Sequence, residues 1–207
     1  ADRKPDMEVK PRRLFSSAFR GMMSKLRKQW RTVYHQAQSS FATGYPEEGE
    51  IAMKYLKNIS EDIRVRSEEC MVILDGLPKY FGVDEQYRCW VKTLRADALR
   101  YLAEVTPENR DTLMREAREL YNGAEENARK LHPFDSFRLA ALLNSAVSLA
   151  TMENQQEAAV HLARDAVNST MGLPKEDYKV RFFVFCSKTV YKRKILFQFP
   201  VMLKKNH

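Results

Sequence analysis

Five residues on two predicted helices could together bind a phosphate group. Arg20, Arg27 and Arg31 are spaced by seven and four residues, which places them on one face of a helix. Arg100 is followed directly by Tyr101 on a second helix. A guanidinium group binds phosphate through two parallel hydrogen bonds, and a tyrosine hydroxyl can donate a further one. A stripe of arginines is also what a solvated helix face contains, and Tyr101 also suits a core position, so the pattern alone leaves both interpretations open.

Asn144 is a second candidate for ligand binding. It lies in residues 139–147, a segment that is otherwise almost entirely apolar. An asparagine amide can pair with the N–H and the C=O of an extended peptide together, without reading its side chains. The same side chain could instead be a buried polar group that is hydrogen-bonded within the protein.

No arrangement of residues in the sequence matches a known catalytic or metal-binding motif. The histidines lie in no HExxH motif, and there is no glycine-rich phosphate loop; the four are His35, His132, His161 and His207. The three cysteines, Cys70, Cys89 and Cys186, lack the CxxC spacing of a zinc site. A small, odd number of cysteines is typical of a protein in a reducing compartment. We therefore predict a protein without enzymatic activity, metal or cofactor.

The 207-residue chain is 44% apolar and has a formal charge of +8, which is concentrated at its two ends. Residues 1–31 carry ten Lys or Arg against three Asp or Glu, a net charge of +7. Residues 179–207 carry eight against none, so residues 32–178 have a net charge of −7. Basic chains can bind nucleic acid or anionic membranes. Because the body is acidic, the average charge is weak support for such partners, and no apolar run approaches the ~18 residues of a membrane span.

Low glycine and proline content and the abundance of Ala, Leu, Glu, Lys and Arg predict an all-α protein. Apolar spacing and helix breakers predict seven helices, over residues 14–38, 47–74, 84–105, 107–131, 134–152, 155–171 and 175–198. Short connections favour an antiparallel array of sequential neighbours. We expect residues 1–13 to be an arm or the remnant of an upstream segment, residues 14–198 to form one domain, and residues 199–207 to be a basic tail.

Four motifs in the same order resemble those of 14-3-3 proteins. The first, residues 14–31, resembles the third helix of that family. In it, Arg20 stands where the family has its groove lysine, and Arg27 stands at the first phosphate-binding arginine. Trp30 and Arg31 match the Trp-Arg pair of the family.

The second and third motifs carry the remaining binding residues that the resemblance implies. Residues 97–105, Asp-Ala-Leu-Arg-Tyr-Leu-Ala-Glu-Val, are similar to the most recognisable string of the family. Arg100 and Tyr101 there occupy the phosphate-binding pair. Residues 132–144 contain His-Pro and then Phe-Arg-Leu-Ala-Ala-Leu-Leu-Asn, which places Asn144 on the asparagine that binds the peptide backbone.

The fourth motif is residues 157–164. Together the four motifs resemble a family whose members form an all-helical array with a concave amphipathic groove, and the resemblance implies the same for this chain. One wall of this groove would be basic, and Leu143 and Val147 would line the apolar wall. The family has no catalytic activity and binds phosphoserine or phosphothreonine peptides. The resemblance therefore implies an adaptor for phosphorylated proteins in signalling, located in the cytoplasm and able to enter the nucleus.

The sequence also departs from the family. The family has nine helices, the first two of which build its dimer, whereas this sequence starts near the third, so we expect a monomer or an atypical dimer. Residues 134–136 are an insertion after the His-Pro pair. A groove glutamate of the family falls on Thr151. The leucines and second asparagine of the last helix are replaced by about Phe183, Ser187 and Tyr191.

Two other functions remain as alternatives. A helical scaffold of this kind could bind proteins after losing its dependence on phosphate. Residues 188–194, Lys-Thr-Val-Tyr-Lys-Arg-Lys, could instead belong to a basic module for nucleic acid or membranes. Nucleic-acid binding weakens steeply with salt, whereas binding of a phosphopeptide with few charges should depend on salt only mildly.

Overall fold

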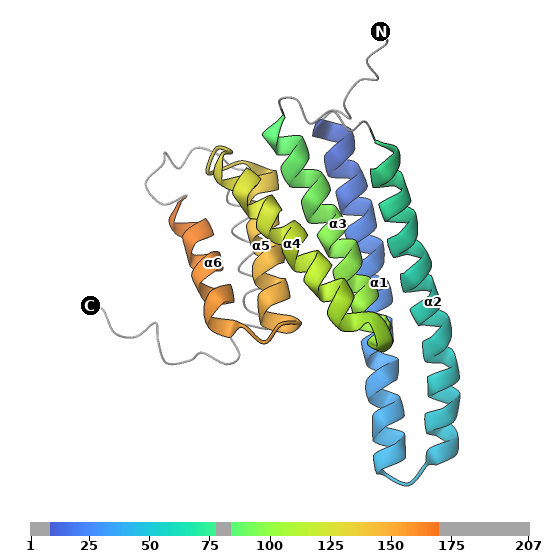
Figure 1. Ribbon diagram of the computed structural model, residues 1–207. Coiled ribbons are helices and arrows are strands. Elements are labelled where there is room, and N and C mark those ends of the chain that lie inside the picture. The colour runs from blue at the N-terminus through green and yellow to red at the C-terminus, as the bar shows by residue number, and fades with distance from the viewer. Residues whose placement is uncertain (1–8, 78–83, 170–207) are drawn as a thin grey trace, which may run out of the picture. The chain divides into compact units, whose positions relative to one another are not determined.

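The computed structural model describes residues 9–77 and 84–169, which form helices joined by short connections (Figure 1). The helices are α1 (Val9–Ala42), α2 (Pro46–Gly76), α3 (Glu85–Val105), the 3-10 helix η1 (Pro107–Asn109), α4 (Arg110–Arg129), α5 (Ser136–Thr151) and α6 (Gln156–Asn168). No strand occurs in these two ranges, so the all-α prediction is confirmed for them. The helix predicted over residues 175–198 lies outside the described residues.

Helix α1 begins at Val9, five residues before the start that the apolar spacing predicted at residue 14. Pro11 lies in the first turn of the helix. Backbone N–H groups there have no intrahelical acceptor, so the absence of an N–H on proline costs no helix hydrogen bond. Arg12 is buried and forms an ion pair with Asp84 at 2.7 Å, which ties this first turn to the residue that precedes α3. At its other end α1 continues beyond the predicted residue 38 to Ala42.

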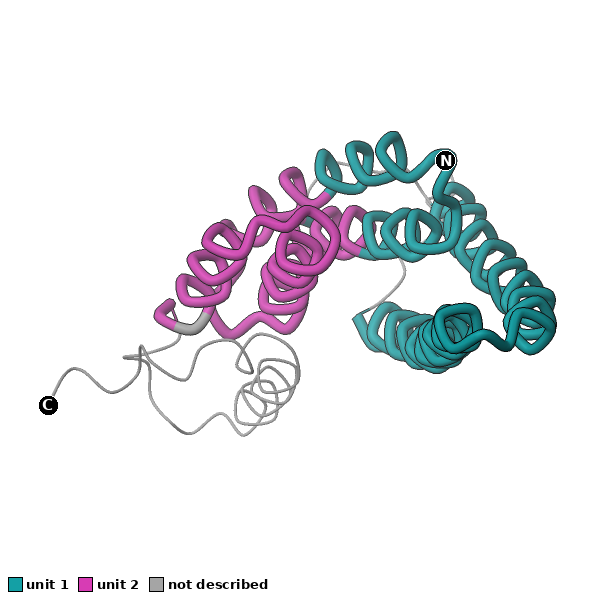
Figure 2. Tube along the Cα trace, turned by 90° about the horizontal axis from the view of Figure 1, so that it is seen from below, with its two compact units in different colours: residues 1–84, 94–120 teal, residues 85–93, 121–207 magenta. Residues whose placement is uncertain are grey.

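The described chain divides into two compact units (Figure 2). Unit 1 contains residues 1–84 and 94–120, and unit 2 contains residues 85–93 and 121–207. Helices α1 and α2 belong to unit 1, whereas α5 and α6 belong to unit 2. Helices α3 and α4 each contribute one part to each unit.

In unit 1, α1 and α2 form a long antiparallel hairpin (Figure 1). Its turn needs Gly44, whose φ of +83° is in the left-handed region that glycine adopts without strain. Helix α2 starts with Pro46 and carries Glu47 and Glu48 in its first turn, where proline fits and acidic side chains are favoured. A Cβ atom at Gly49 would lie 2.6 Å from the ring of Phe41, so glycine allows the two helices to approach closely here.

The core of unit 1 is apolar and comes from four helices. Its buried side chains include Phe19, Met23, Leu56, Ile59, Ile63, Leu74, Leu94, Leu99, Tyr101 and Met114. The indole N–H of Trp30 donates to Ser60 Oγ at 2.8 Å and connects α1 to α2. This packing fixes the helix surfaces on which the arginines of α1 and α3 stand.

Unit 2 contains the start of α3, the second half of α4, and helices α5 and α6. Asp135 is the N-cap of α5, because its Oδ1 accepts hydrogen bonds from the backbone N–H groups of Phe137 at 2.8 Å and Arg138 at 3.2 Å. The three-residue insertion noted in the sequence thus includes the cap of this helix. No helix within the described ranges is long and apolar enough to cross a membrane.

Candidate functional site

The structure brings together Arg27, Arg100 and Tyr101 within unit 1. Arg27 comes from α1, and the other two come from α3. The guanidinium carbon of Arg27 lies 4.3 Å from the centroid of the Tyr101 ring, and that of Arg100 lies 4.7 Å from it. Both cations are thus at cation–π distance from one aromatic ring. Three side chains that can donate hydrogen bonds to a phosphate are therefore clustered.

Tyr101 is at the same time a core residue. Only 5% of it is exposed, and its ring lies 5.9 Å from that of Phe19, measured between centroids. Arg100 is equally buried, whereas 14% of the Arg27 side chain is exposed. The two interpretations of Tyr101 are therefore compatible, because packing holds the ring against which the two guanidinium groups lie.

Glu104, on α3, binds two of the arginines of α1. The Nε–H of Arg27 donates to its Oε2 atom, and Arg31 donates to its Oε1 atom from both Nε, at 2.8 Å, and Nη2. Each carboxylate oxygen thus holds one arginine. The Glu104 side chain is only 12% exposed, so these two partners compensate a charge that is mostly removed from water.

Asp97 makes a similar arrangement one heptad earlier on α3. Its Oδ2 atom accepts a hydrogen bond from Nε of Arg20 at 2.8 Å, and its Oδ1 atom lies 3.4 Å from Nη2 of Arg100. Asp97 is fully buried. It therefore joins one arginine of α1 to one of α3, and it connects Arg20 to the same cluster as Arg27.

Charge decides what this cluster can bind. Burial, and then repulsion from Arg100, lower the pKa of Arg27, while attraction and a hydrogen bond to Glu104 act in the opposite direction. Burial alone would raise the pKa of Glu104, but attraction to Arg27 and Arg31 outweighs it and holds that pKa below its usual value. Ion pairs in the cluster join four arginines, Arg20, Arg27, Arg31 and Arg100, to two carboxylates, Asp97 and Glu104. A phosphate monoester, with about 1.5 to 2 negative charges at neutral pH, has the sign of charge that these arginines attract.

The second set of predicted binding residues lies in unit 2, on α5. Leu143, Asn144 and Val147 are all half-buried, in contrast to their fully buried neighbours on the same helix. Their spacing places them on one face of α5. The structure thus brings these three together with each other, and it places them in a different compact unit from the arginine cluster.

Thr151 is the last residue of α5. The family resemblance places a groove glutamate at this position, where this chain has a threonine instead. Its hydroxyl donates to the carbonyl oxygen of Val147, one turn earlier, at 2.7 Å. This residue therefore serves its own helix. Two carboxylates that do bind arginines of the cluster are Asp97 and Glu104.

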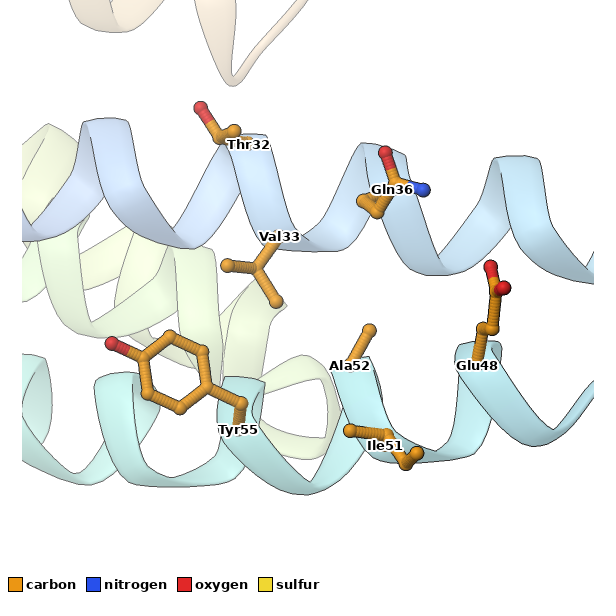
Figure 3. Close-up of a pocket in the computed structure, with 7 residues that line it drawn as sticks. All are labelled: Thr32, Val33, Gln36, Glu48, Ile51, Ala52 and Tyr55. Carbon is orange, nitrogen blue, oxygen red and sulfur yellow. The ribbon is translucent and has the colours of Figure 1, made fainter.

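A different hollow lies between α1 and α2 in unit 1 (Figure 3). Its volume is about 460 Å³, and its lining consists of Thr32, Val33, Gln36, Glu48, Ile51, Ala52 and Tyr55. Apolar side chains dominate this lining, and the one charged residue among the seven is an acid. The hollow therefore offers no cation to a phosphate, in contrast to the cluster around Tyr101.

Sequence reasoning identified the arginines but missed their carboxylate partners. Asp97 and Glu104 are seven residues apart, which is also the separation of Arg20 and Arg27. Two helices with charges of opposite sign at the same spacing can form two ion pairs when they pack side by side. That matched spacing is the feature of the sequence from which the two carboxylate partners could have been predicted.

Comparison with known proteins adds the family. A family model described as 14-3-3 protein matches residues 1–180. The protein named 14-3-3 protein 2 from Entamoeba histolytica is 24% identical over 184 residues, which cover 86% of this chain and 77% of that relative. The family match spans most of the chain and includes both the arginine cluster and α5, and the chain therefore belongs to the 14-3-3 family.

Proposed function

We propose that this protein is a non-catalytic adaptor that binds phosphoserine- or phosphothreonine-containing segments of other proteins. The observation that carries the proposal is the convergence of Arg27 and Arg100 on the ring of Tyr101, at 4.3 Å and 4.7 Å from its centroid. Membership of the 14-3-3 family supports an adaptor role at the level of the family.

In this proposal the phosphate is held by hydrogen bonds from α1 and α3. Arg27 and Arg100 donate to the phosphate oxygens, the hydroxyl of Tyr101 donates a further hydrogen bond, and Arg20 adds positive charge from one side. Charge-assisted bonds of this kind need no metal and no cofactor. The protein then changes the location, activity or contacts of its partner by occupying the phosphorylated segment.

The family resemblance also suggests a role for residues of α5 in binding a peptide backbone. The amide of Asn144 can pair with a backbone N–H and C=O of the peptide, which adds affinity without selecting a sequence. Leu143 and Val147 would contact apolar side chains of the partner. We expect this function in the cytoplasm, with access to the nucleus, where phosphorylated proteins are present.

A peptide array tests the proposal. Each phosphoserine or phosphothreonine peptide is placed beside its unphosphorylated twin, and bound protein is measured for wild type, for Arg27→Ala and for Arg64→Ala. Arg64 is a matched control, because it is a partly exposed arginine of α2 that pairs with Glu61 and Glu68 on its own helix. We expect wild type and Arg64→Ala to prefer the phosphorylated member of many pairs and Arg27→Ala to lose this preference.

The same array decides between this function and the alternatives. Equal binding of both members of each pair would contradict the proposal and favour a scaffold that does not depend on phosphate. Absence of peptide binding, together with salt-sensitive binding of a single-stranded oligonucleotide, would favour the basic module. Residues 188–194, which suggested that module, lie outside the described residues.

A further inference from the structure

Glu104 forms ion pairs with two arginines of α1, Arg27 and Arg31. We propose that Glu104 is a positioning residue, which fixes the guanidinium group of Arg27 so that both of its Nη groups are presented to the phosphate. This inference rests on the proposed phosphopeptide function. It concerns how the site is prepared before a ligand arrives.

The hydrogen bonds of Arg27 define the orientation. A guanidinium group has five N–H donors, one on Nε and two on each Nη. Arg27 donates its Nε–H to Glu104 Oε2. A phosphate that binds Arg27 in a bidentate way must therefore use the edge formed by the two Nη groups, to which each nitrogen contributes one N–H. Fixing Nε thus selects one of the two edges through which an arginine can make a bidentate contact.

Arg27 needs such an anchor because of its neighbours. Arg100 lies against the same aromatic ring, and the repulsion between the two guanidinium groups favours conformations in which Arg27 moves away. A free arginine side chain also has many rotamers, whose entropy is lost when a ligand immobilises it. Glu104 offsets the repulsion and restricts the rotamers before binding, which is the usual benefit of a preorganised site.

Glu104 is itself held in place. Arg31 donates to its other oxygen, Oε1, through two nitrogens. The carboxylate is therefore fixed from one side by Arg31 while it fixes Arg27 from the other. Asp97 is less suitable for a test of this kind, because it is fully buried and its replacement would destabilise the fold.

The direction in which a mutation of Glu104 changes phosphopeptide affinity distinguishes a positioning role from a purely electrostatic effect of its charge. The carboxylate of Glu104 is negative and lies beside the place where the phosphate would bind, so charge alone predicts that its removal strengthens binding. Positioning predicts the opposite, because Arg27 loses its anchor. Glu104→Gln removes the charge and keeps the size of the side chain, so the direction of the change in affinity distinguishes the two.

The experiment measures Kd for one phosphoserine peptide and its unphosphorylated twin at fixed ionic strength, with wild type, Glu104→Gln and Glu61→Gln. Glu61 is the matched control, because it is an exposed helical glutamate that also pairs with an arginine. We expect Glu104→Gln to weaken phosphopeptide binding roughly tenfold, and Glu61→Gln to change it less than about twofold. In the ¹H–¹⁵N spectrum, the Nε resonance of Arg27 should move in Glu104→Gln and stay in place in Glu61→Gln.

Equal or tighter phosphopeptide binding by Glu104→Gln would overturn this inference and leave the proposed function standing. A wild-type protein that does not distinguish the twins would overturn the proposed function and this inference with it. If Glu104→Gln does not fold, Glu104→Asp replaces it, since it keeps the charge and is too short to hold both arginines. Glu104→Asp should then weaken binding, and unchanged affinity would overturn the inference.

Discussion

The guanidinium group of Arg27 lies against the ring of Tyr101, with its carbon atom 4.3 Å from the ring centroid. The two residues come from different helices, and the buried ring gives the cation a fixed surface at the edge of the core of unit 1. A cation at such a place is partly shielded from water, so a phosphate that meets it forms stronger bonds than it would at an exposed arginine.

Replacing Arg27 with alanine should weaken phosphopeptide binding by about 2 kcal/mol, the value expected when a charge-assisted hydrogen bond is removed. Stability should change less, because Glu104 keeps Arg31 as its partner. Isothermal titration calorimetry with a fixed phosphopeptide measures the first effect, and thermal unfolding measures the second. Equal affinities of Arg27→Ala and wild type would show that Arg27 does not touch the ligand.

Tyr101 has two parts that can be tested separately. Tyr101→Phe keeps the ring against which Arg27 and Arg100 lie and removes the hydroxyl, so it should weaken phosphopeptide binding by about 1 kcal/mol and leave the fold intact. Tyr101→Ala also removes a buried ring and should lower the free energy of unfolding by about 3 kcal/mol or more. Unchanged peptide affinity in Tyr101→Phe would show that the hydroxyl does not contribute to phosphopeptide binding.

Asp97 should be a stability residue. Asp97→Ala leaves Arg20 and the buried Arg100 without their shared carboxylate, and breaking a buried pair of this kind costs about 3 kcal/mol. Asp75 is the matched control, because it forms an exposed ion pair with Arg95 at 2.6 Å, whose loss should cost less than about 1 kcal/mol. Urea unfolding measures both variants, and similar midpoints would contradict the assignment of Asp97.

The lowered pKa of Glu104 predicts how its contribution to stability depends on pH. A carboxyl group whose pKa is lower in the folded state stabilises that state fully above its unfolded pKa of about 4.3, and this contribution disappears as pH falls through the folded value. The difference in the free energy of unfolding between wild type and Glu104→Gln should therefore be constant near neutral pH. It should shrink below about pH 4. A difference that grew on acidification would mean that Glu104 is not ionised in the folded protein.

The helices and the arginine cluster could be predicted from local sequence. Apolar spacing and helix breakers placed six helices with errors of a few residues, because burial of one helix face leaves a regular pattern. The residues at the cluster were predicted from their types and from the family resemblance. Arg27, Arg100 and Tyr101 then lay together in the structure because α1 and α3 pack within one unit.

The remainder depends on contacts between residues that are distant in the sequence. Helix α1 begins earlier than predicted because Arg12 pairs with Asp84, 72 residues later. Glu104 and Asp97 left only a long-range signal, the spacing that they share with Arg20 and Arg27, since a single acid on a helix is usually solvated. Lys92 likewise donates to the carbonyl oxygen of Gly123 at 3.2 Å, where a Cβ atom on Gly123 would lie only 2.8 Å from the lysine nitrogen. Pairings of this kind become visible only when the helices are placed.

The most direct test of the account is a calorimetric titration of the wild-type protein with the strongest phosphoserine peptide from the array and with its unphosphorylated twin, at low and at high salt. We predict that the phosphorylated peptide binds at least about tenfold more tightly, because only its phosphate can accept charge-assisted hydrogen bonds from the arginines at Tyr101. Its affinity should fall only mildly with salt, since few charges are neutralised. Equal affinities for the two peptides would contradict the central claim that this cluster recognises phosphate.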